Sequence, residues 1–434
     1  MTTPSSEQDK LVRVLARGDV LALAFGAMIG WGWIVLTGTA IQSAGSVGAI
    51  LAFIVGGLAI IMVGLTYAEL ASAMPKVGGE HVYSYRALGH LPSFLCTWAI
   101  ILGYLSVVAF EAVALPTVIE HLAPNYAVGH LWTIAGWEVK ATWVAVGVGG
   151  SLAMMIINYF GVTTAALIQK VVTGMILLVG VLFVTGALFE GETINMMPLF
   201  TQADTGVVAG IVAVLVMVPF LFVGFDVIPQ AAEEINLPYK AIGKVLMMSV
   251  ILAVVWYALI ILATSLALNS TELAASSLSV PDAMGSLFNA PWASNLMILA
   301  GIAGIITSWN AFYIGGSRAI YALAKAGMLP APFAKLHPRY KTPTNAIFLM
   351  GFLSCIAPFF GRPALVWIVN AGGLGIVIAY LFVAISFVVL RVREPDMPRP
   401  FRIRHGKLCG TLAVVLSFGM ACLYLPGSPA ALSG

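Results

Sequence analysis

Three carboxylic acids lie within long apolar stretches of the chain, where a charge is costly and usually functional. They are Glu69, Glu111 and Asp226. Asp226 follows Gly224 and Phe225 in a glycine- and proline-rich interruption, which predicts a site or gating role, with a helix cap as the alternative. Glu111 could relay a proton, attract a cationic solute, or accept a structural hydrogen bond from a neighbouring helix. Glu69 lies near one end of its stretch, and a structural role is expected for it.

Two of the apolar stretches are interrupted by residues that weaken a helix. The first contains Gly26, Gly30 and Gly32, and each glycine costs a helix about 1 kcal/mol relative to alanine. The sixth contains Pro219 and Pro229. A broken helix is tolerated in lipid only where it lines a protected or water-filled cavity. Interruptions at matching places of two five-helix halves indicate an inverted-repeat carrier with its site between the halves, and glycines for close helix packing are the alternative.

The chemistry of a broken helix favours a solute that carries both charges. Freed N–H groups at the start of a half-helix attract a carboxylate, and freed carbonyl oxygens attract an ammonium group or a cation. An amino acid carries both groups and is the solute that this pattern favours. A polyamine or biogenic amine is the rival, because the charges in the apolar stretches are all acidic and Trp31 and Trp33 offer faces that suit a cation.

The composition places these stretches in a lipid bilayer. Apolar residues make up 60% of the 434 positions and charged residues 9%, against about 45–50% and about 25% in soluble chains. All four cysteines lie in apolar runs, which argues against disulfides or zinc. Scattered histidines, short basic segments and the lack of a phosphate-binding loop argue against metal, nucleic-acid and nucleotide sites. We expect no enzyme and no organic cofactor.

Eleven apolar segments are long enough to cross a membrane and predict an all-α membrane fold. They are residues 19–41, 47–72, 93–119, 142–160, 163–189, 206–230, 245–268, 294–322, 344–361, 364–391 and 408–426. With the N-terminus inside, all 21 Lys and Arg residues except Lys140 and Arg362 fall on the inner side. This pattern predicts a multi-pass protein of the cytoplasmic membrane with a cytoplasmic N-terminus.

The predicted organisation is one membrane core with short flanking parts. An odd number of crossings places the C-terminus outside, where residues 425–429 look like the start of a hairpin, and whether a twelfth helix has been lost stays open. The predicted divisions are a cytoplasmic N-terminal segment at 1–18, a ten-helix inverted-repeat core at 19–391 with repeats at 19–189 and 206–391, and a cytoplasmic loop, eleventh helix and tail at 392–434.

Short motifs along nearly the whole chain resemble those of the amino acid–polyamine–organocation (APC) transporters. In chain order they are Gly26-x-x-Ile29-Gly30-x-Gly32; Tyr67-x-Glu69-Leu70 with Pro75-x-x-Gly78-Gly79 and Tyr83-x-Tyr85; Gly224-Phe225-Asp226 with Glu233-Glu234; Asn310 and Ser317-Arg318 with Gly327-x-x-Pro330; and Arg391 with Arg399-Pro400-Phe401. The resemblance implies a ten-helix inverted-repeat core with a further helix, and secondary active transport of an amino acid by alternating access. A non-transporting amino-acid sensor is the alternative from another class.

The resemblance also implies a place for the site. Backbone of the first break would hold the substrate carboxylate, carbonyl oxygens of the sixth break would hold the amine, and an aromatic residue there would gate the site. The candidate substrate-binding residues are Met28, Ile29, Gly30, Trp31, Gly32, Phe220, Gly224 and Asp226, and the candidates for gating or coupling are Phe220, Glu111 and Asp226. The family usually has smaller residues at positions 31 and 33, so the two tryptophans either narrow the pocket or serve packing.

The sequence leaves the coupling ion open between sodium, a proton, and exchange or facilitated diffusion without an ion. Some proton-coupled relatives have a lysine midway along the fifth helix, and residues 174–177 here include none. In sodium-coupled branches of the fold, first-helix carbonyls and eighth-helix hydroxyls hold the ion, and the matching residues are Gly26, Ile29, Gly304, Thr307 and Ser308. The expected partners are a small-molecule substrate and the lipid bilayer, without nucleic acid, and the oligomeric state is not indicated.

Overall fold

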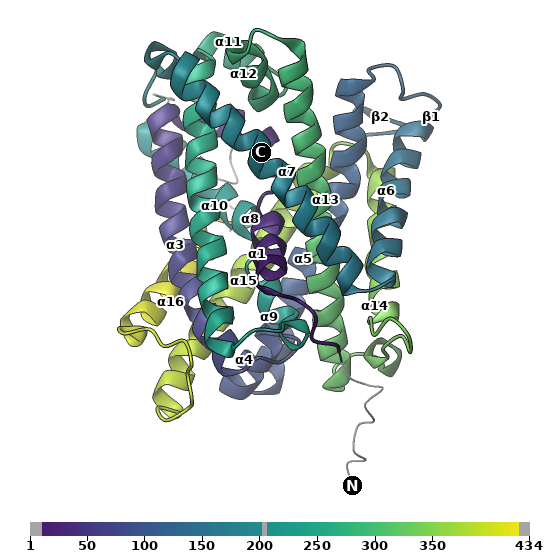
Figure 1. Ribbon diagram of the computed structural model, residues 1–434, viewed down its shortest axis with the longest axis vertical. Helices are drawn as coiled ribbons and strands as arrows, with labels where there is room; N and C mark the ends of the chain where they lie inside the picture. The colour runs from purple at the N-terminus through teal and green to yellow at the C-terminus, as the bar shows by residue number, and fades with distance from the viewer. Residues whose placement is uncertain (1–10, 202–205, 425–434) are drawn as a thin grey trace.

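Helices form nearly all of the computed structural model, which describes residues 11–201 and 206–424 (Figure 1). Continuous apolar runs fold this way because each backbone N–H and C=O group in lipid must bond within the protein. The elements are α1 (Arg17–Met28), α2 (Gly32–Ala44), α3 (Ser46–Ala73), α4 (Glu80–Leu88), α5 (His90–Leu122), β1 (His130–Ile134), β2 (Trp137–Lys140), α6 (Ala141–Tyr159), α7 (Val162–Glu190), α8 (Val207–Phe222), α9 (Val227–Gln230), α10 (Tyr239–Ala267), α11 (Ser270–Ala275), α12 (Ser279–Leu287), α13 (Pro291–Lys325), α14 (Thr344–Ile356), α15 (Ala364–Arg393) and α16 (Gly406–Cys422), with short 3₁₀ turns between some of them.

The predicted crossings coincide with helices in the described part of the chain. Eight helices are long and apolar enough to cross a membrane, and α1 with α2, bent by 43° at their break, make a ninth. Residues Thr344–Phe360 and α16 are shorter apolar helices at the places of the other two predicted crossings. The chain is therefore a multi-pass membrane protein. The tail at 425–429 and the first ten residues lie outside the described residues.

The two predicted halves pack in a reciprocal way. Helix α3 lies along α10, α5 along α13, and α6 along α14, so each pair joins helices at the same place in the two halves. The fifth helix of each half also packs on the third helix of the other half, because α7 packs on α13 and α15 packs on α5. This reciprocal packing is the pattern that an inverted repeat produces. The exact residue boundaries of the two repeats remain a prediction.

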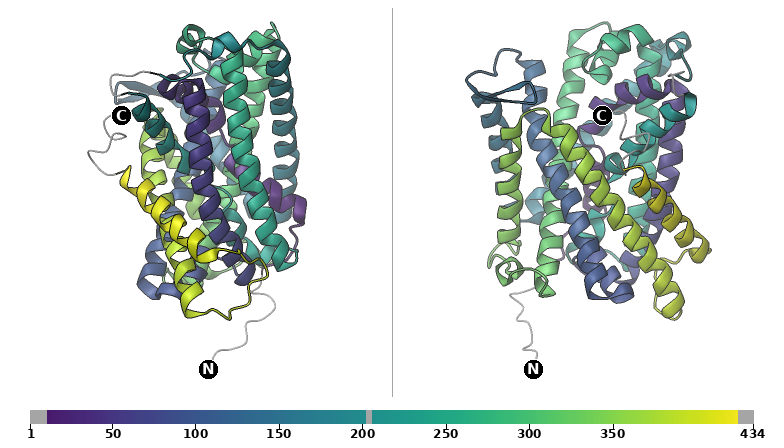
Figure 2. Two further views of the ribbon diagram at one scale, coloured as in Figure 1. Left: turned by 90° about the vertical axis from the view of Figure 1, so that its left-hand side faces the viewer. Right: turned by 180° about the vertical axis from the view of Figure 1, so that it is seen from behind.

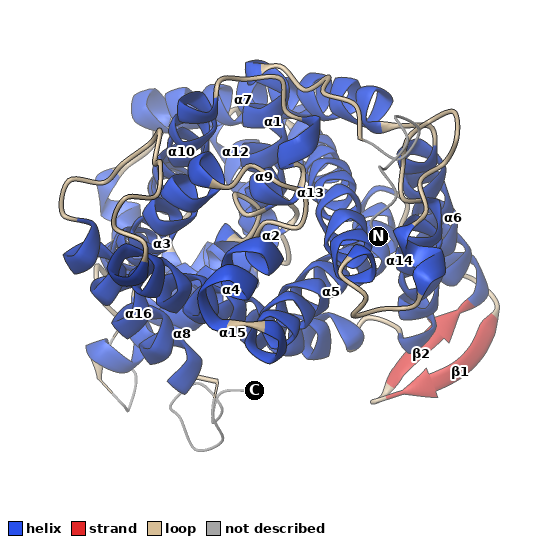
Figure 3. Cartoon of the chain, turned by 90° about the horizontal axis from the view of Figure 1, so that it is seen from below, coloured by secondary structure: helices blue, strands red, loops and turns tan. Residues whose placement is uncertain are grey.

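Several small elements outside the crossings were not predicted, because they carry no long apolar run. Strands β1 and β2 form an antiparallel hairpin between α5 and α6, at the edge of the helix bundle in Figure 3. Short helices α11 and α12 lie at the same end of the molecule (Figure 1). At the other end, α16 packs against α15 and α3, as the two side views of Figure 2 show.

The end of the bundle nearest residue 11 is called the N-terminal face below. Hydrogen bonds and an ion pair join its segments to one another. The backbone N–H groups of Val14 and Leu15 both donate to the Glu234 carbonyl oxygen at 2.9 Å. The Glu234 carboxylate in turn forms a buried two-point ion pair with Arg318 of α13, with both N–O distances at 2.9 Å. Buried ion pairs of this kind hold only while both partners stay together, because separating them leaves two buried charges uncompensated.

Glu69 has the structural surroundings that the sequence predicted. Its carboxylate accepts hydrogen bonds from Arg391 at 2.8 and 2.5 Å and lies 3.0 Å from the Arg399 guanidinium. The backbone N–H of Ile403 donates to the same carboxylate at 2.8 Å. The group therefore fastens α3 to α15 and to the segment after it, away from the helix breaks.

Candidate substrate site at two helix breaks

The first break leaves helix ends without side-chain caps. Helix α1 ends at Met28, Ile29 leaves the helical conformation, and α2 begins at Gly32 with Trp31 as its uncapped first residue. The Trp31 side chain therefore does not cap the first N–H groups of α2, and the helix dipole gives this end a partial positive charge. This end of α2 is the part of the site that suits a carboxylate.

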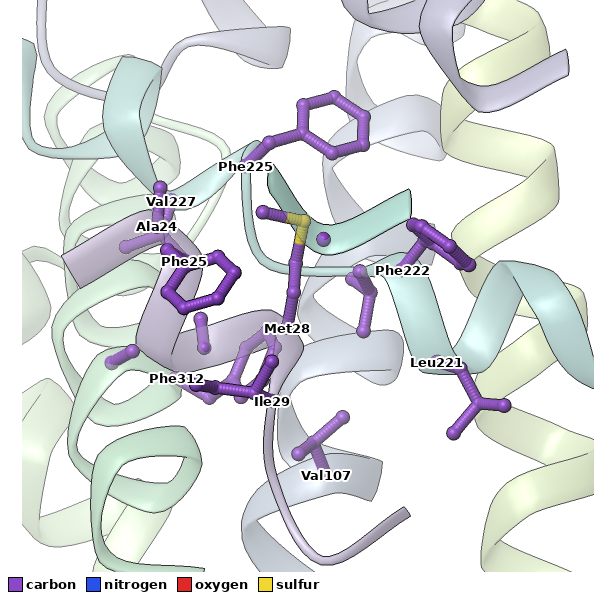
Figure 4. Packing of buried hydrophobic residues seen from close by; sticks show 14 of the residues in the cluster. Ala24, Phe25, Met28, Ile29, Val107, Leu221, Phe222, Phe225, Val227 and Phe312 are labelled. Atoms are coloured by element: carbon purple, nitrogen blue, oxygen red, sulfur yellow. The ribbon is translucent and has the colours of Figure 1, made fainter. Parts of the chain in front are cut away.

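The second break approaches the first so closely that only glycine fits. Helix α8 ends at Phe222, and Gly224 adopts φ of 139°, a conformation that residues with a side chain rarely take. A Cβ on Gly224 would lie 2.6 Å from the Ala27 side chain and 3.0 Å from the Met28 backbone nitrogen. Figure 4 shows apolar side chains of both broken segments, among them Met28 and Phe222, gathered in one cluster.

Tyr257 of α10 joins the two breaks through its hydroxyl. The hydroxyl oxygen lies 2.8 Å from the Met28 carbonyl oxygen and 3.3 Å from the Leu221 carbonyl oxygen. Both carbonyls are freed by a helix end, so one buried hydroxyl serves acceptors on two segments. Tyr257 is 1% exposed.

Glu111 of α5 brings a carboxylate to the start of α2. Its Oε1 atom lies 2.7 Å from the position that a Cβ on Gly30 would take, and the Ser308 hydroxyl lies 2.8 Å from that same position. The Trp31 backbone N–H and the Ser308 hydroxyl both donate hydrogen bonds to this carboxylate. Its Oε2 atom is buried and has no hydrogen-bond partner. The chain's own carboxylate thus stands where the sequence predicted that the substrate would bind.

A small cavity lies between the two breaks. Its volume is about 20 Å³, room for one or two water molecules. It is lined by Ala27, Met28, Gly30, Gly32, Val107, Phe110, Glu111, Phe220, Leu221, Val223, Tyr257, Ser308 and Phe312. Four of the eight predicted substrate-binding residues line this cavity, namely Met28, Gly30, Gly32 and Phe220, and Ile29, Trp31, Gly224 and Asp226 do not. The cavity must widen before it can hold an amino acid.

Two aromatic rings separate this cavity from a larger vestibule. Phe110 and Phe220 pack edge to face with ring centroids 5.5 Å apart, and both line the small cavity. Phe110 also lines a vestibule of about 390 Å³ on the side away from the N-terminal face, where His121 and Arg362 supply polar groups. Phe220 therefore lies where a gating aromatic is expected, with Phe110 as an unpredicted partner.

The two tryptophans of the first break have different surroundings. Trp31 lines the vestibule and packs closely on Gly301, where an added Cβ would lie 2.3 Å from its ring. Trp33 instead packs edge to face on Trp256 of α10, with ring centroids 5.3 Å apart, and lines neither cavity. Trp31 thus narrows the entrance, whereas Trp33 serves packing.

Asp226 does not line the cavity between the breaks. Its Oδ1 atom accepts a hydrogen bond from the Gly224 N–H at 2.7 Å, and its Oδ2 atom is buried without a partner. The carboxylate therefore holds the turn of the second break from the side of the N-terminal face. This role is structural, but it is not the helix cap that the sequence left open, because the Asp226 side chain makes no capping hydrogen bond to α9. One carboxylate oxygen stays free for a further role.

The candidate sodium residues lie near one another, but their oxygen atoms do not all face one point. Gly304 packs on the first break, where its Cβ would lie 2.8 Å from the Ile29 carbonyl oxygen, and Thr307 lies against Gly26. Ser308 turns instead towards Glu111 and Gly30. The Gln169 amide nitrogen also faces Gly26, 2.5 Å from the place of an added Cβ. Sodium binding here remains a prediction, and an amide donor stands beside it.

Beside the candidate sodium residues, hydrogen bonds between buried amide side chains connect α6 to α1. Asn158 of α6 donates to Asn310 of α13 at 3.1 Å, and Asn310 donates to the Gln169 carbonyl of α7 at 2.9 Å. The Gln169 amide then donates to the Ala22 carbonyl oxygen at 3.2 Å. A neutral polar network therefore holds α1 against α7 and α13.

With two breaks around one cavity established, comparison with known proteins gives the family. The amino acid permease family model matches residues 18–433. The chain belongs to the amino acid permease family. The permease is 28% identical to the branched-chain amino acid permease BcaP of Bacillus subtilis (strain 168), over 97% of this chain and 89% of that one. It is also 27% identical to a methylthioribose transporter of that bacterium, over 92% of this chain and 85% of the transporter. An aspartate-proton symporter of the same bacterium is 26% identical, over 95% of this chain and 79% of the symporter.

These findings confirm the APC resemblance and the prediction of amino acid transport. The family and these relatives are permeases and transporters, and the relatives are named for branched-chain amino acids, methylthioribose and aspartate. Membership therefore makes the permease a transporter of small molecules embedded in a membrane. The choice of amino acid follows from none of these names.

Two residues of the site, and one buried carboxylate outside it, do not stand out in the sequence. Tyr257 and Phe110 lie in apolar helices without a local motif, and only the fold brings them to the breaks. Glu80 follows the Gly78-Gly79 pair, and the sequence placed it in a loop although it is fully buried. A carboxylate directly after a glycine pair that was already recognised as a motif was the available signal for Glu80.

Proposed function

We propose that the permease moves a zwitterionic α-amino acid across the cytoplasmic membrane by alternating access. The observation that carries this proposal is the cavity between two facing helix breaks, with the N–H groups of a helix start on one side and carbonyls of a helix end on the other. These two kinds of backbone group complement the carboxylate and the ammonium of an amino acid. The collapsed volume fits a carrier whose site closes between exposures to the two sides.

The N–H groups of Gly30 and Gly32 would hold the substrate carboxylate, and carbonyls of the α8 break would hold the ammonium. The free Oε2 atom of Glu111 would accept the same ammonium, which lies only one carbon away from the carboxylate. Pairing of this kind also offsets the repulsion between Glu111 and the bound carboxylate. The apolar lining from Val107 and Phe312 would favour an apolar side chain.

The distribution of basic residues supports the orientation. Lys and Arg concentrate at the N-terminal face, whereas Arg362 and Lys140 lie at the other end. By the positive-inside rule, this distribution supports a cytoplasmic N-terminal face. The vestibule that ends at Trp31 and Phe110 would then open to the outside, and the Glu234–Arg318 pair would close the cytoplasmic side.

An amine carrier is the second candidate, because Glu111 already supplies a carboxylate at the start of α2. In such a carrier Glu111 would be the principal binding group and the substrate would need no carboxylate. In the amino-acid carrier, Glu111 contributes one charge-assisted hydrogen bond among several. The two candidates therefore predict different losses when this carboxylate is removed.

Counterflow in proteoliposomes tests the proposal and excludes a non-transporting sensor. Vesicles loaded with unlabelled L-leucine should take up labelled L-leucine, but not the amine that lacks its carboxylate. Glu111→Gln should weaken binding about tenfold to a hundredfold, the effect of one hydrogen bond to a charged group. Glu120→Gln, further along the same helix, is the matched control and should not change it. Uptake of the amine alone, abolished by Glu111→Gln, would replace this proposal with the amine carrier, and binding without flux would indicate a sensor.

The coupling ion belongs to the same proposal. We favour a proton, because the Gln169 amide N–H lies beside Gly26 in the place that a sodium ion would need, and a proton symporter is among the similar proteins. Accumulation of L-leucine driven by a sodium gradient would favour sodium at Gly26, Ile29, Gly304, Thr307 and Ser308. Flux that responds to neither gradient would indicate exchange or facilitated diffusion.

A further inference from the structure

A second polar cluster lies below the α8 break, towards the N-terminal face, and the substrate site does not use it. It consists of two carboxyl groups, Glu80 at the start of α4 and Asp226 in the break, with polar side chains around them. The surrounding side chains come from α3, α5, α9 and α15 and are Tyr67, Tyr104, Gln230 and Tyr380. Every one of these six residues is buried.

Two glycines bring Glu80 to this place. Gly78 and Gly79 both have positive φ, 93° and 28°, and a Cβ on Gly79 would lie 2.8 Å from the Pro229 side chain. The tight turn therefore lays the start of α4 directly on α9. The Gln230 amide donates to the Glu80 Oε2 atom. The Gly78 N–H also approaches the Gln230 carbonyl oxygen, at 3.5 Å.

Several buried oxygen atoms of this cluster have no hydrogen-bond partner. Among the described residues, the unpartnered buried atoms here are Glu80 Oε1, Asp226 Oδ2, Gln230 Oε1 and the hydroxyls of Tyr67, Tyr104 and Tyr380. Three aromatic rings enclose them: Phe225, Tyr67 and Tyr380 lie with centroids 5.3 to 5.8 Å apart. Buried polar atoms are normally bonded, so a group of orphans in one place points to a bound species.

Within the described residues, no basic side chain forms an ion pair with either carboxyl group. The charged and titratable groups that act on Glu80 are Asp226 from the break, Tyr67 from α3, Cys96 and Tyr104 from α5, Tyr380 from α15 and Tyr83 on its own helix. The nearby Arg318 is already paired with Glu234. Burial, and then the negative charge of Asp226, raises the pKa of Glu80 well above its ordinary value.

We propose that Glu80 and Asp226 together bind one proton while the N-terminal face is closed, and that this pair is the proton-coupling site of the permease. Two like charges buried together cannot both stay ionised at ordinary cost, so one carboxyl keeps an O–H bond and donates to the orphaned acceptors. The other stays ionised and accepts from tyrosine hydroxyls. The pair lies between α4 and the short α9, directly below the substrate break.

Opening of the N-terminal face would release this proton. Movement of α9 away from α4 breaks the Gln230–Glu80 contact and admits water to both carboxyl groups. In water each carboxyl returns towards its ordinary acidity, so the O–H bond breaks and the proton passes to water on that side. Substrate release and proton release then depend on the same movement. The coupling role rests on the proposed transport function, but proton binding by the pair does not.

Infrared difference spectroscopy of the purified full chain tests the proton directly. At neutral pH the wild type should show the carbonyl band of a protonated carboxyl, which Glu80→Gln removes and Glu80→Asp retains. The melting temperature gives a second measure. A group with a raised pKa binds more protons folded than unfolded, so stability falls as pH rises from its ordinary pKa towards the raised one. Glu80→Gln should flatten this fall, and Glu233→Gln, the control on the same face, should not.

Transport then tests the coupling. An inward gradient of one pH unit is worth about 1.4 kcal/mol, or about tenfold accumulation for one proton per substrate. Wild type and Glu233→Gln should accumulate L-leucine to this extent, whereas Glu80→Gln should bind and exchange it but lose the accumulation. An unchanged proton-driven accumulation in Glu80→Gln would overturn the inference, as would a sodium-specific thermal shift lost in that variant. Failure of every variant to bind any amino acid would instead count against the proposed function, and the infrared band would still report on the pair.

Discussion

The hydroxyl of Tyr257 lies 2.8 Å from the carbonyl oxygen of Met28, and 3.3 Å from that of Leu221, so it links the two broken helices at the substrate site. One side chain of α10 thereby contacts both of the segments between which the small cavity lies. The contact also protects carbonyl groups that a broken helix leaves without their usual partners.

Tyr257→Phe should lower both stability and substrate affinity. The change leaves buried carbonyl oxygens without a donor, which costs about 1–3 kcal/mol. A lowered melting temperature in detergent and a raised L-leucine concentration for half-maximal exchange would show it. Tyr239→Phe, at an exposed position at the start of the same helix, is the control. Equal behaviour of the two variants would show that the hydroxyl contact contributes nothing.

Gly224→Ala should abolish transport. The alanine would be strained at φ of 139° and would collide with Ala27, so the two breaks would be forced apart. Gly174→Ala is a sharp control, because nothing lies within 4 Å of that position and α7 gains helix propensity there. Surface expression and exchange measured for both variants check this. Normal exchange by Gly224→Ala would mean that the close approach of the breaks is dispensable.

Phe110→Ala should widen the range of substrates. Removing one ring of the Phe110–Phe220 pair joins the small cavity to the vestibule, so larger side chains can enter. Competition of amino acids of increasing size against labelled L-leucine measures the effect. Phe94→Ala, on the same helix but remote from the cavity, is the control. A substrate range that stays as narrow as in the wild type would remove Phe110 from the gate.

Sodium should not stabilise the protein more than potassium does. The Gln169 amide beside Gly26 offers N–H donors rather than the oxygen ligands that a hard cation requires. Melting temperatures at equal concentrations of the two chlorides, with and without L-leucine, check this. A sodium-specific increase that Thr307→Ala removes would restore the sodium site implied by the family resemblance.

The sequence was sufficient for the fold because its information is carried by length and polarity. Each apolar run needed only to be long enough to span, and the interruptions at Gly30 and Gly224 marked the two breaks directly. The carboxylate at Glu111 was also visible, because a charge inside an apolar run stands out. The contacts of Glu111 were not visible, because the packing of α5 on α13 brings it to Ser308 and the first helix break brings Gly30 to both.

The remaining site residues depend on contacts between distant helices. Tyr257 and Phe110 are ordinary aromatic residues of apolar helices, and nothing local distinguishes them from packing residues. Glu80 was hidden for the opposite reason, because a carboxylate next to two glycines looks like part of a solvated loop. Its burial follows from the Gly78-Gly79 turn lying on α9, which no local pattern reveals.

The most direct test of the central claim is a thermal-unfolding screen of the purified permease against L-amino acids and the matching amines that lack the carboxylate. A ligand at 100 times its dissociation constant adds about 2.7 kcal/mol of stability, which a melting curve resolves. The proposed site predicts that α-amino acids stabilise the protein and that their decarboxylated amines do not. Stabilisation by the amines alone would contradict it, because the N–H groups of Gly30 and Gly32 would then not be binding a substrate carboxylate.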